Sequence, residues 1–201
     1  MTIIEDKAQQ EGKHELKHAY WEKEGIELLR YPLPVGDYIL MSEKVADVIH
    51  RKDSRNVDIK KTDFMGSYNI TVDSKKDIDE LCANICGPEH ARFRDECILA
   101  QNNGIKLIVL VENKAEVISR DGRVFNPFIE KLDDLHRWIN PRLMIRMGNG
   151  MLKYPKATRG VTLMKAAMSM EHKYGVKFVF CQPKDAGKRI LELLGGEDEN
   201  L

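Results

Sequence analysis

The stretch Ile105–Val111, which reads IKLIVLV, is the most apolar run of the chain and decides the fold. Every residue in it except Lys106 is aliphatic, which is typical of a strand that helices bury on both faces. Residues 89–102, just before it, have a helical pattern that ends at Asn103-Gly104. We therefore expect this strand at the centre of a sheet covered by helices.

The residues upstream of this central strand predict a mixture of short strands and helices. Apolar spacing predicts strands over 2–4 and 26–30 and helices over 12–24 and 76–86. After Gly36 the pattern becomes strand-like in four segments separated by charged turns, over residues 38–40, 45–49, 57–59 and 68–72. Such a series predicts an antiparallel meander.

The residues downstream continue the alternation of helices and strands. A hairpin is expected over 116–125, with Asp121-Gly122 at its turn. The other expected elements are helices over 127–138, 162–174 and 184–194, a strand over 176–181 and a mobile loop over 148–160. The fold class is therefore α/β: a central sheet flanked by helices, in one domain over residues 1–195. Residues 196–201 are expected to form a disordered acidic tail.

Charge is balanced overall but unevenly distributed along the chain. Lys and Arg together number 32, as do Asp and Glu, so net charge alone indicates no partner. From Leu135 to Met170, however, there is no acidic residue. A basic segment of this kind is what phosphate neutralisation requires. The candidate DNA-binding residues in it are Arg137, Arg142, Arg146, Lys153, Lys156 and Arg159.

The composition also limits the compartment and the use of cysteine. The sequence has no apolar run of the ~20 residues that span a bilayer, and its start, MTIIEDKAQQ, does not have the layout of a signal peptide. We expect an intracellular protein without a membrane partner. Its four cysteines are expected to be buried free thiols. A zinc site using Cys82, Cys86 and histidines is an alternative, although Cys-x-x-Cys spacing is absent.

Three residues at the ends of expected strands form the candidate catalytic set: Asp37, Asp73 and Lys75. Residues two apart on a strand point to the same side, so Asp73 and Lys75 share a face, and an adjacent strand can place Asp37 beside them. Two carboxylates can hold Mg²⁺ or Mn²⁺, with the backbone carbonyl of Ser74 as a further oxygen ligand. The lysine can position the attacking water or stabilise charge on a phosphate. Taken alone, Asp-x-Lys is also a common solvated strand end.

A wider series of motifs gives this set its context. In chain order it comprises Ile3-Ile4-Glu5-Asp6, Gly36-Asp37-Tyr38, Asp73-Ser74-Lys75, Asp79, Arg92-Phe93, Ile108–Glu112 and Tyr174-Gly175-Val176. Over residues 2–194 the pattern resembles the XPF-type structure-specific nuclease domain, a branch of the PD-(D/E)XK superfamily. In that family Gly-Asp-Tyr precedes Glu-Arg-Lys, followed by three residues and Asp.

The resemblance implies both a fold and an activity. The fold would be the restriction-endonuclease-like mixed sheet, with the antiparallel meander at the active site and residues 1–195 as the nuclease domain. The activity would be a metal-dependent DNA endonuclease, a hydrolase acting on branched or recombination and repair intermediates. Mg²⁺ or Mn²⁺ would be the cofactor, with no small-molecule cofactor. A homodimer through the last two helices is expected, in a single-domain form from the cytoplasm of a bacterium or a phage-infected host.

Four further residues are assigned supporting roles by this resemblance. Asp6 is an outer metal ligand or a water-binding group, against a simple strand-end charge. Asp79 would orient Lys75 or Arg92, although an acid in a first helical turn also complements the helix dipole. Arg92 would contact phosphate or pair with Asp79. Glu112 would support the site or be a strand-end charge.

The sequence also departs from the family pattern. Asp73 replaces the family's Glu, Ser74 replaces its Arg, and Ala8 stands where its first motif usually has Arg. No helix-hairpin-helix DNA-binding domain is recognisable after the nuclease part. These departures keep an alternative open, in which the chain is a catalytically inactive DNA-binding or partner-binding module with the same fold.

Overall fold

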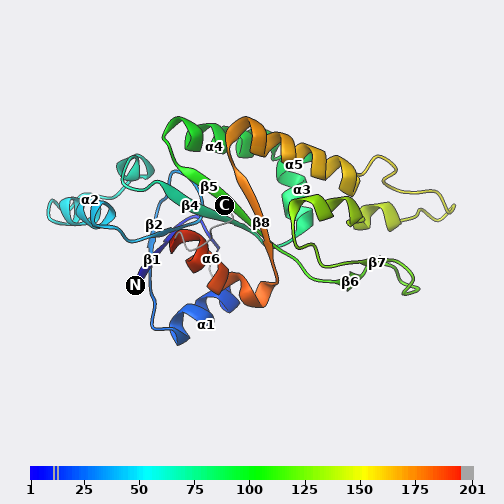
Figure 1. Ribbon diagram of the computed structural model, residues 1–201, viewed down its shortest axis with the longest axis horizontal. Coiled ribbons are helices and arrows are strands. Elements are labelled where there is room, and N and C mark those ends of the chain that lie inside the picture. Colours follow the sequence, from blue (N-terminus) through cyan, green and yellow to red (C-terminus); the bar gives the residue numbers. More distant parts are fainter. Residues whose placement is uncertain (11, 13, 196–201) are drawn as a thin grey trace.

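The computed structural model describes residues 1–10, 12 and 14–195, so the tail expected at 196–201 lies outside the described residues. Its centre is a six-stranded sheet in the order β2-β1-β3-β4-β5-β8 (Figure 1). The strands are β1 (Thr2–Asp6), β2 (Glu27–Tyr31), β3 (Tyr38–Leu40), β4 (Ile70–Lys75), β5 (Lys106–Glu112) and β8 (Lys177–Cys181). Strand β3 is antiparallel to both neighbours, and the other adjacent pairs are parallel. The expected α/β class is confirmed, with a mostly parallel mixed sheet.

Helices cover both faces of this sheet. Helices α3 (Ile78–Cys86), α4 (His90–Asn102) and α5 (Gly160–Tyr174) lie on one face, and α1 (Glu15–Lys23) and α6 (Ala186–Gly195) lie on the other (Figure 1). Side chains of β5 alternate between two core clusters, as the pleat of a strand requires. Leu107, Val109 and Val111 pack in the cluster of α3, α4 and α5, whereas Ile108 and Leu110 pack in that of α1 and α6. Strand β5 is thus buried on both faces, as its sequence predicts.

Strand direction determines which residues meet at one end of the sheet. Strands β1, β4 and β5 run the same way, so their carboxyl ends lie at one edge, where the antiparallel β3 begins. Asp6 closes β1, Asp73 and Lys75 lie at the end of β4, and Asp37 immediately precedes β3. Open α/β sheets commonly place their sites at the carboxyl ends of strands. The topology therefore gathers the candidate residues at this edge.

The expected four-stranded meander is wrong in its middle. Residues 45–49 lie within a helix, α2 (Glu43–Asp53), in which Val45 and Val48 are buried. Ser42 caps this helix by accepting a hydrogen bond from the backbone N–H of Val45. Residues 57–59 form no strand, and a 3₁₀ helix, η1 (Lys61–Phe64), follows them. Spacing of three between Val45 and Val48 fits a helix, although β-branched side chains such as theirs are enriched in strands.

The region between β5 and α5 also differs from the expectation. The hairpin is present as β6 (Glu116–Val117) and β7 (Phe125–Asn126), with a turn closed by Gly122 N–H on Ser119 O. The helix expected over 127–138 is a shorter 3₁₀ helix, η2 (Leu132–Arg137). Before it the chain is extended, because the Asn113 side chain both accepts from and donates to the backbone of Ile129. Two more 3₁₀ helices are η3 (Pro141–Met144) and η4 (Pro183–Asp185).

Helix α1 leaves some of its apolar side chains in solvent. Lys17 and Trp21 are buried, whereas Leu16 and Ala19 are exposed.

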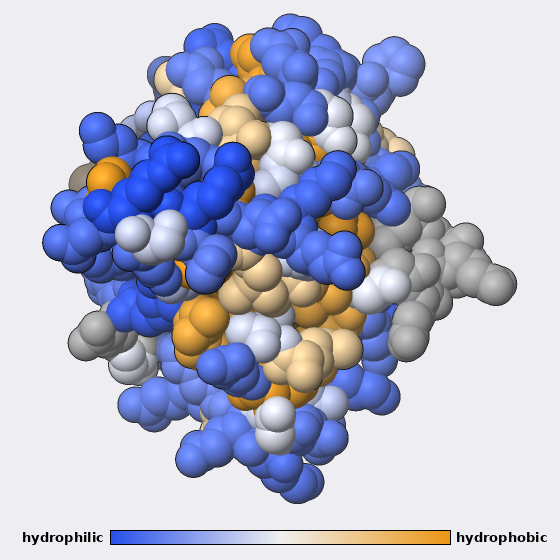
Figure 2. Space-filling view, turned by 90° about the vertical axis from the view of Figure 1, so that its left-hand side faces the viewer, coloured by the Kyte–Doolittle hydropathy of each residue, from blue (hydrophilic) through white to orange (hydrophobic). Residues whose placement is uncertain are grey.

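Viewed from the side of α2, the surface is mainly hydrophilic, with a few apolar residues near the middle (Figure 2). In the part of the chain that the structure describes, no helix has the length and apolarity needed to cross a bilayer.

Candidate active site

A pocket of about 1120 Å³ opens at the edge of the sheet where β1, β4 and β5 end. Its floor is acidic, and its walls come from the loop after β1, the start of β3, the start of α3 and one side of α4. The candidate residues that line it are Asp6, Asp37, Asp73, Ser74, Lys75, Asp79 and Arg92. The structure thus brings together all of the sequence-predicted catalytic, metal and supporting residues except Glu112.

Asp73 and Lys75 form a buried ion pair on the floor of this pocket. Lys75 Nζ lies 2.9 Å from Asp73 Oδ1 and 2.7 Å from Oδ2. They share a side of β4, as the two-residue spacing predicts. Burial alone would lower the pKa of Lys75. The carboxylates of Asp73 and Asp37 together outweigh burial, so the pKa lies above its ordinary value. The lysine is therefore held in its charged form.

Asp37 reaches the same point from a turn that requires glycine. Gly36 has a φ of +72°, and a Cβ at this residue would lie 2.0 Å from Thr71 Oγ1, so only glycine fits here. The Asp37 Oδ2 accepts hydrogen bonds from the backbone N–H of Ser74 at 2.8 Å and from its hydroxyl at 3.3 Å. Oδ1 accepts a hydrogen bond from the Gln9 side chain. Burial and the adjacent Asp73 carboxylate raise the pKa of Asp37 well above its ordinary value.

The chemistry of this pair fits a hard divalent cation. The carboxylates of Asp37 and Asp73 lie side by side in the pocket, and the charge of Asp73 makes ionisation of Asp37 costly. Among the described residues, no group forms a hydrogen bond with Asp73 Oδ2, although that atom is buried and close to Lys75. In the same residues, no three His, Cys, Asp or Glu side chains converge as a metal cluster. Mg²⁺ is suited to this setting, since it is usually held by one or two carboxylates, waters and substrate phosphates.

Glu96 is a site residue that the sequence analysis missed. It lies on α4 one turn after Arg92, lines the pocket, and accepts a hydrogen bond from the backbone N–H of Gly36 at 2.9 Å. Burial and the charge of Asp73 raise the pKa of Glu96. The four-residue spacing from Arg92 is the signal that could have found it, because such residues share a helix face.

The other expected supporting residues occupy the pocket in different ways. One oxygen of Asp6 accepts from the backbone N–H groups of Leu33 and Ala8, so this carboxylate orders the loops around the site. Arg92 does not pair with Asp79 but lies 3.3 Å from Glu89, with most of its side chain exposed. Asp79 is exposed at the rim of the pocket, in the first turn of α3.

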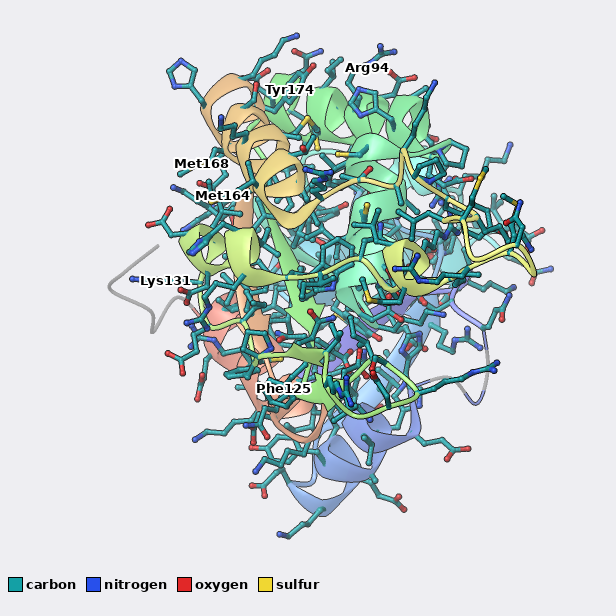
Figure 3. The ribbon with its side chains drawn as sticks, turned by 90° about the vertical axis from the view of Figure 1, so that its right-hand side faces the viewer. Arg94, Phe125, Lys131, Met164, Met168 and Tyr174 are labelled. Atoms are coloured by element: carbon teal, nitrogen blue, oxygen red, sulfur yellow. The ribbon has the colours of Figure 1, made fainter. Side chains whose placement is uncertain are left out.

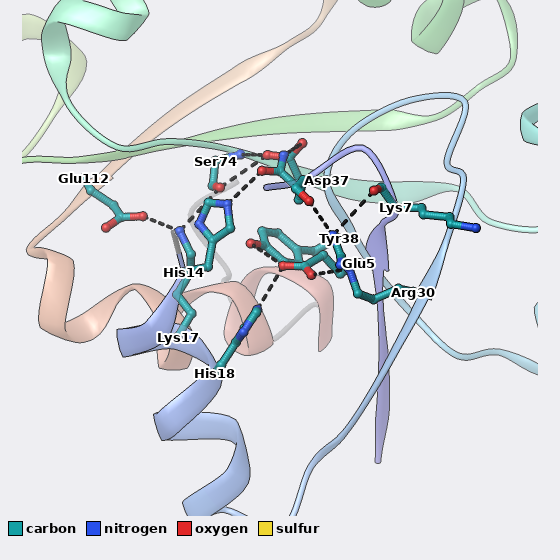
Figure 4. A network of polar contacts seen from close by, with 11 residues as sticks. Glu5, Lys7, His14, Lys17, His18, Arg30, Asp37, Tyr38, Ser74 and Glu112 are labelled. Carbon is teal, nitrogen blue, oxygen red and sulfur yellow. Dashed lines mark hydrogen bonds and ion pairs between the residues drawn. The ribbon is translucent and has the colours of Figure 1, made fainter. Parts of the chain in front are cut away.

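Glu112 lies on the opposite face of the sheet from Asp73. Residues at even positions of β5 face α1 and α6, so Glu112 points under the site rather than into it. There it forms a 2.5 Å ion pair with the buried Lys17 of α1, whose Nζ is also 3.5 Å from the Ser74 hydroxyl (Figure 4). Glu112 is absent from the pocket because side chains alternate along a strand, which makes Ser74 and Glu112 point away from Asp73.

A second polar group lies next to this ion pair. The buried Glu5 contacts His18 at 3.0 Å and Arg30 at 3.1 Å, and accepts a hydrogen bond from the Tyr38 hydroxyl (Figure 4). His14 contacts Gln9, which in turn donates to Asp37. The two histidines are therefore parts of a polar network beside the site.

The candidate DNA-binding residues lie outside the pocket. All six are exposed: Arg137, Arg142, Arg146, Lys153, Lys156 and Arg159. Trp138, which lies among them in sequence, is buried in the core. Three of the four free thiols are buried, as expected, but Cys86 is exposed.

Comparisons with known proteins agree on one family. The model of the ERCC4 domain matches residues 6–194. The structure of XPF from Aeropyrum pernix matches with a TM-score of 0.51 and 14% identity, over 100% of this chain and 67% of that one. XPF from Aeropyrum pernix in complex with DNA matches with a TM-score of 0.50 and 13% identity, over 98% and 64%. The chain thus spans about two thirds of the length of these proteins. The curated proteins contain no match.

Proposed function

This chain belongs to the ERCC4 domain family, and we propose that it is a divalent-metal-dependent endonuclease that hydrolyses phosphodiester bonds of DNA. The observation that supports this most is the cluster of Asp37, Asp73 and Lys75 on the floor of an open pocket. A substrate class of branched or recombination and repair intermediates is part of the proposal. That part draws on the resemblance to structure-specific nuclease domains, and the XPF structure in complex with DNA supports DNA as the substrate.

In this proposal, each member of the cluster has a separate task. Asp37 and Asp73 hold Mg²⁺ or Mn²⁺, with the main-chain oxygen of Ser74 as a further ligand and Asp6 outside them. When bound, the cation lowers the pKa of the attacking water and offsets charge on the phosphate. Lys75, paired with Asp73, positions the attacking water or stabilises charge in the transition state. Asp79 and Arg92 are proposed to act at the rim of the pocket, where phosphate would enter.

The exposed surface of the protein outside the pocket has a proposed role in binding DNA. The six exposed basic residues between Arg137 and Arg159 are the proposed phosphate-binding surface.

We also propose a homodimer. The outer side of α5 is its proposed interface, because Met168 is exposed there while Met170 is buried, and Figure 3 shows Met164, Met168 and Tyr174 along this helix. Sedimentation should show a dimer that Met168→Glu converts to a monomer, whereas Val57→Glu, at another exposed site, should not.

Cleavage of linear duplex, flap and four-way-junction DNA with Mg²⁺ or Mn²⁺ tests the hydrolase. Asp73→Asn should reduce cleavage to background, and Lys75→Ala should slow it by at least about 100-fold. Asp47→Asn, an exposed acid on α2, is the matched control and should cut like the parent. A parent that binds DNA but never cuts it would favour the inactive module, and an active Asp73→Asn protein would place the site elsewhere.

A further inference from the structure

Residues 139–159 form a finger that projects from the rest of the molecule. Figure 1 shows this segment, in yellow, extending beyond the amino end of α5. Its outer half is a small hairpin, in which the backbones of Arg146 and Leu152 form an antiparallel β-bridge. Backbone N–H groups of Met147 and Lys153 donate to Met151 O and Ile145 O, each at 2.8 Å. Part of the segment expected as a mobile loop is therefore folded as a hairpin.

The tip of this finger is apolar and exposed. Opposite pairing of 146 with 152 places Met147 against Met151 and Ile145 against Lys153 on one face of the hairpin. Met151 is 60% exposed, Ile145 43% and Met147 41%. The same finger holds no acidic residue but carries Arg142, Arg146, Lys153, Lys156 and Arg159. Exposed apolar side chains that are contiguous and rimmed by polar residues are typical of an interaction site.

The two legs of the finger are joined at its base by a buried side chain. The buried Asn140 side chain donates to Thr158 O at 3.1 Å and accepts from Arg142 N–H at 3.0 Å, so it joins the two legs. Burial and Asp77 raise the pKa of Asp79, and the nearby Arg142 guanidinium opposes them. Because Asp79 lines the pocket and the charge of Arg142 acts on it, the base of the finger lies toward the start of α3.

We propose that the finger tip packs on the exposed base pair where a DNA duplex ends at a branch, and so selects branched DNA over continuous duplex. This inference rests on the proposed action on DNA and names the feature that the protein would recognise. Methionine and isoleucine are among the apolar residues that proteins insert at opened base steps, and the flanking basic residues would neutralise the adjacent phosphates. A continuous duplex offers no exposed base face, so the tip would remain in solvent.

A binding experiment in EDTA separates this role from catalysis. Forked DNA carrying 2-aminopurine in the last base pair of its duplex is compared with a continuous duplex of the same sequence. Parent protein should prefer the fork and increase the 2-aminopurine fluorescence. Met147→Ser/Met151→Ser should reduce the fork preference about tenfold, the order expected for one lost base contact. Met151→Trp, which enlarges the apolar tip, should retain or increase it, and Leu16→Ser/Val57→Ser, at two other exposed apolar sites, should leave it unchanged.

Other results of these experiments would either overturn the role of the finger or separate it from hydrolysis. An unchanged fork preference in Met147→Ser/Met151→Ser overturns it. A change in the sedimentation of that variant also overturns it, because the tip would then be a self-association surface. If fork preference depends on the tip but no DNA is cut with Mg²⁺ or Mn²⁺, the finger role stands and the proposed hydrolysis fails. Equal cleavage of forked and continuous DNA by the parent, with no difference in binding, supports hydrolysis and rejects the finger role.

Discussion

Asp37 illustrates how a functional residue lowers the stability of its own site. Its carboxylate is buried beside Asp73, and its pKa is raised well above its ordinary value of 3.8. A carboxyl with a raised folded pKa contributes stability at low pH, and the contribution is lost as pH rises through that folded pKa. At neutral pH without metal, ionisation of Asp37 therefore opposes folding.

Asp37→Asn should stabilise the metal-free protein while abolishing cleavage. The amide oxygen can still accept from Ser74 N–H, and the repulsion with Asp73 disappears. In urea titrations with EDTA at about pH 7.5, we expect the free energy of unfolding to rise by about 1 kcal/mol. The gain should shrink at pH about 5, where the parent Asp37 takes up its proton more readily. A destabilised variant would contradict the like-charge account.

Glu96 provides a test of positioning at the same scale. Its side chain holds the N–H of Gly36, the residue just before Asp37. Glu96→Ala should raise the Mn²⁺ concentration for half-maximal cleavage about 10- to 100-fold, as loss of a group that orients a metal ligand typically does. Glu96→Gln, which keeps the acceptor, should behave nearly like the parent. If Gln is as harmful as Ala, the charge of Glu96 is what matters.

Among single residues, the sequence predicted those whose neighbours are close along the chain. The two-residue step from Asp73 to Lys75 and the turn at Gly36 determine side-chain direction locally, and these residues do meet. Glu96 and Gln9 contribute through contacts 60 and 28 residues away in sequence, which no local pattern specifies. Their roles depend on the packing of whole elements.

At the scale of elements, the strongest sequence signals came from composition and the errors from ambiguous short runs. The central strand β5 was predictable because an aliphatic run of this length is stable only when buried on both faces. The run at 45–49 reads equally as a strand or as a helix, and the Ser42 cap decides for α2. The exposed Leu16 shows that a buried lysine can displace an apolar residue from the core side of a helix.

The Lys17–Glu112 pair predicts how α1 is attached to the sheet. Both side chains are largely buried, and the pair lies beneath Ser74. Lys17→Met alone should cost about 3–5 kcal/mol in urea unfolding, because it leaves a carboxylate buried without its partner. The double variant Lys17→Met/Glu112→Leu should recover most of that loss. Equal losses in the single and double variants would mean that the pair contributes through packing rather than charge.

At the scale of the whole molecule, opposite charges are separated between the pocket and the finger. The chain has a formal net charge of zero, yet the pocket floor carries Asp37 and Asp73 while the finger carries basic residues alone. An acidic pocket repels phosphate until a cation is bound, whereas the basic finger attracts it at any time. DNA binding should therefore depend mainly on the finger, and cleavage on the pocket.

Salt dependence of binding tests this division of charge. Each phosphate neutralised by a basic residue adds about 0.9 to the slope of log Kd against log salt concentration for duplex DNA. Lys153→Ala/Lys156→Ala removes two exposed finger charges, so it should lower the slope by about 1.8 and weaken binding to fork and duplex alike. Lys23→Ala/Lys44→Ala makes the same change in net charge on α1 and α2 and should leave the slope as it is in the parent. An equal drop in both variants would show that DNA responds to net charge alone, and the finger would then have no direct part in phosphate contact.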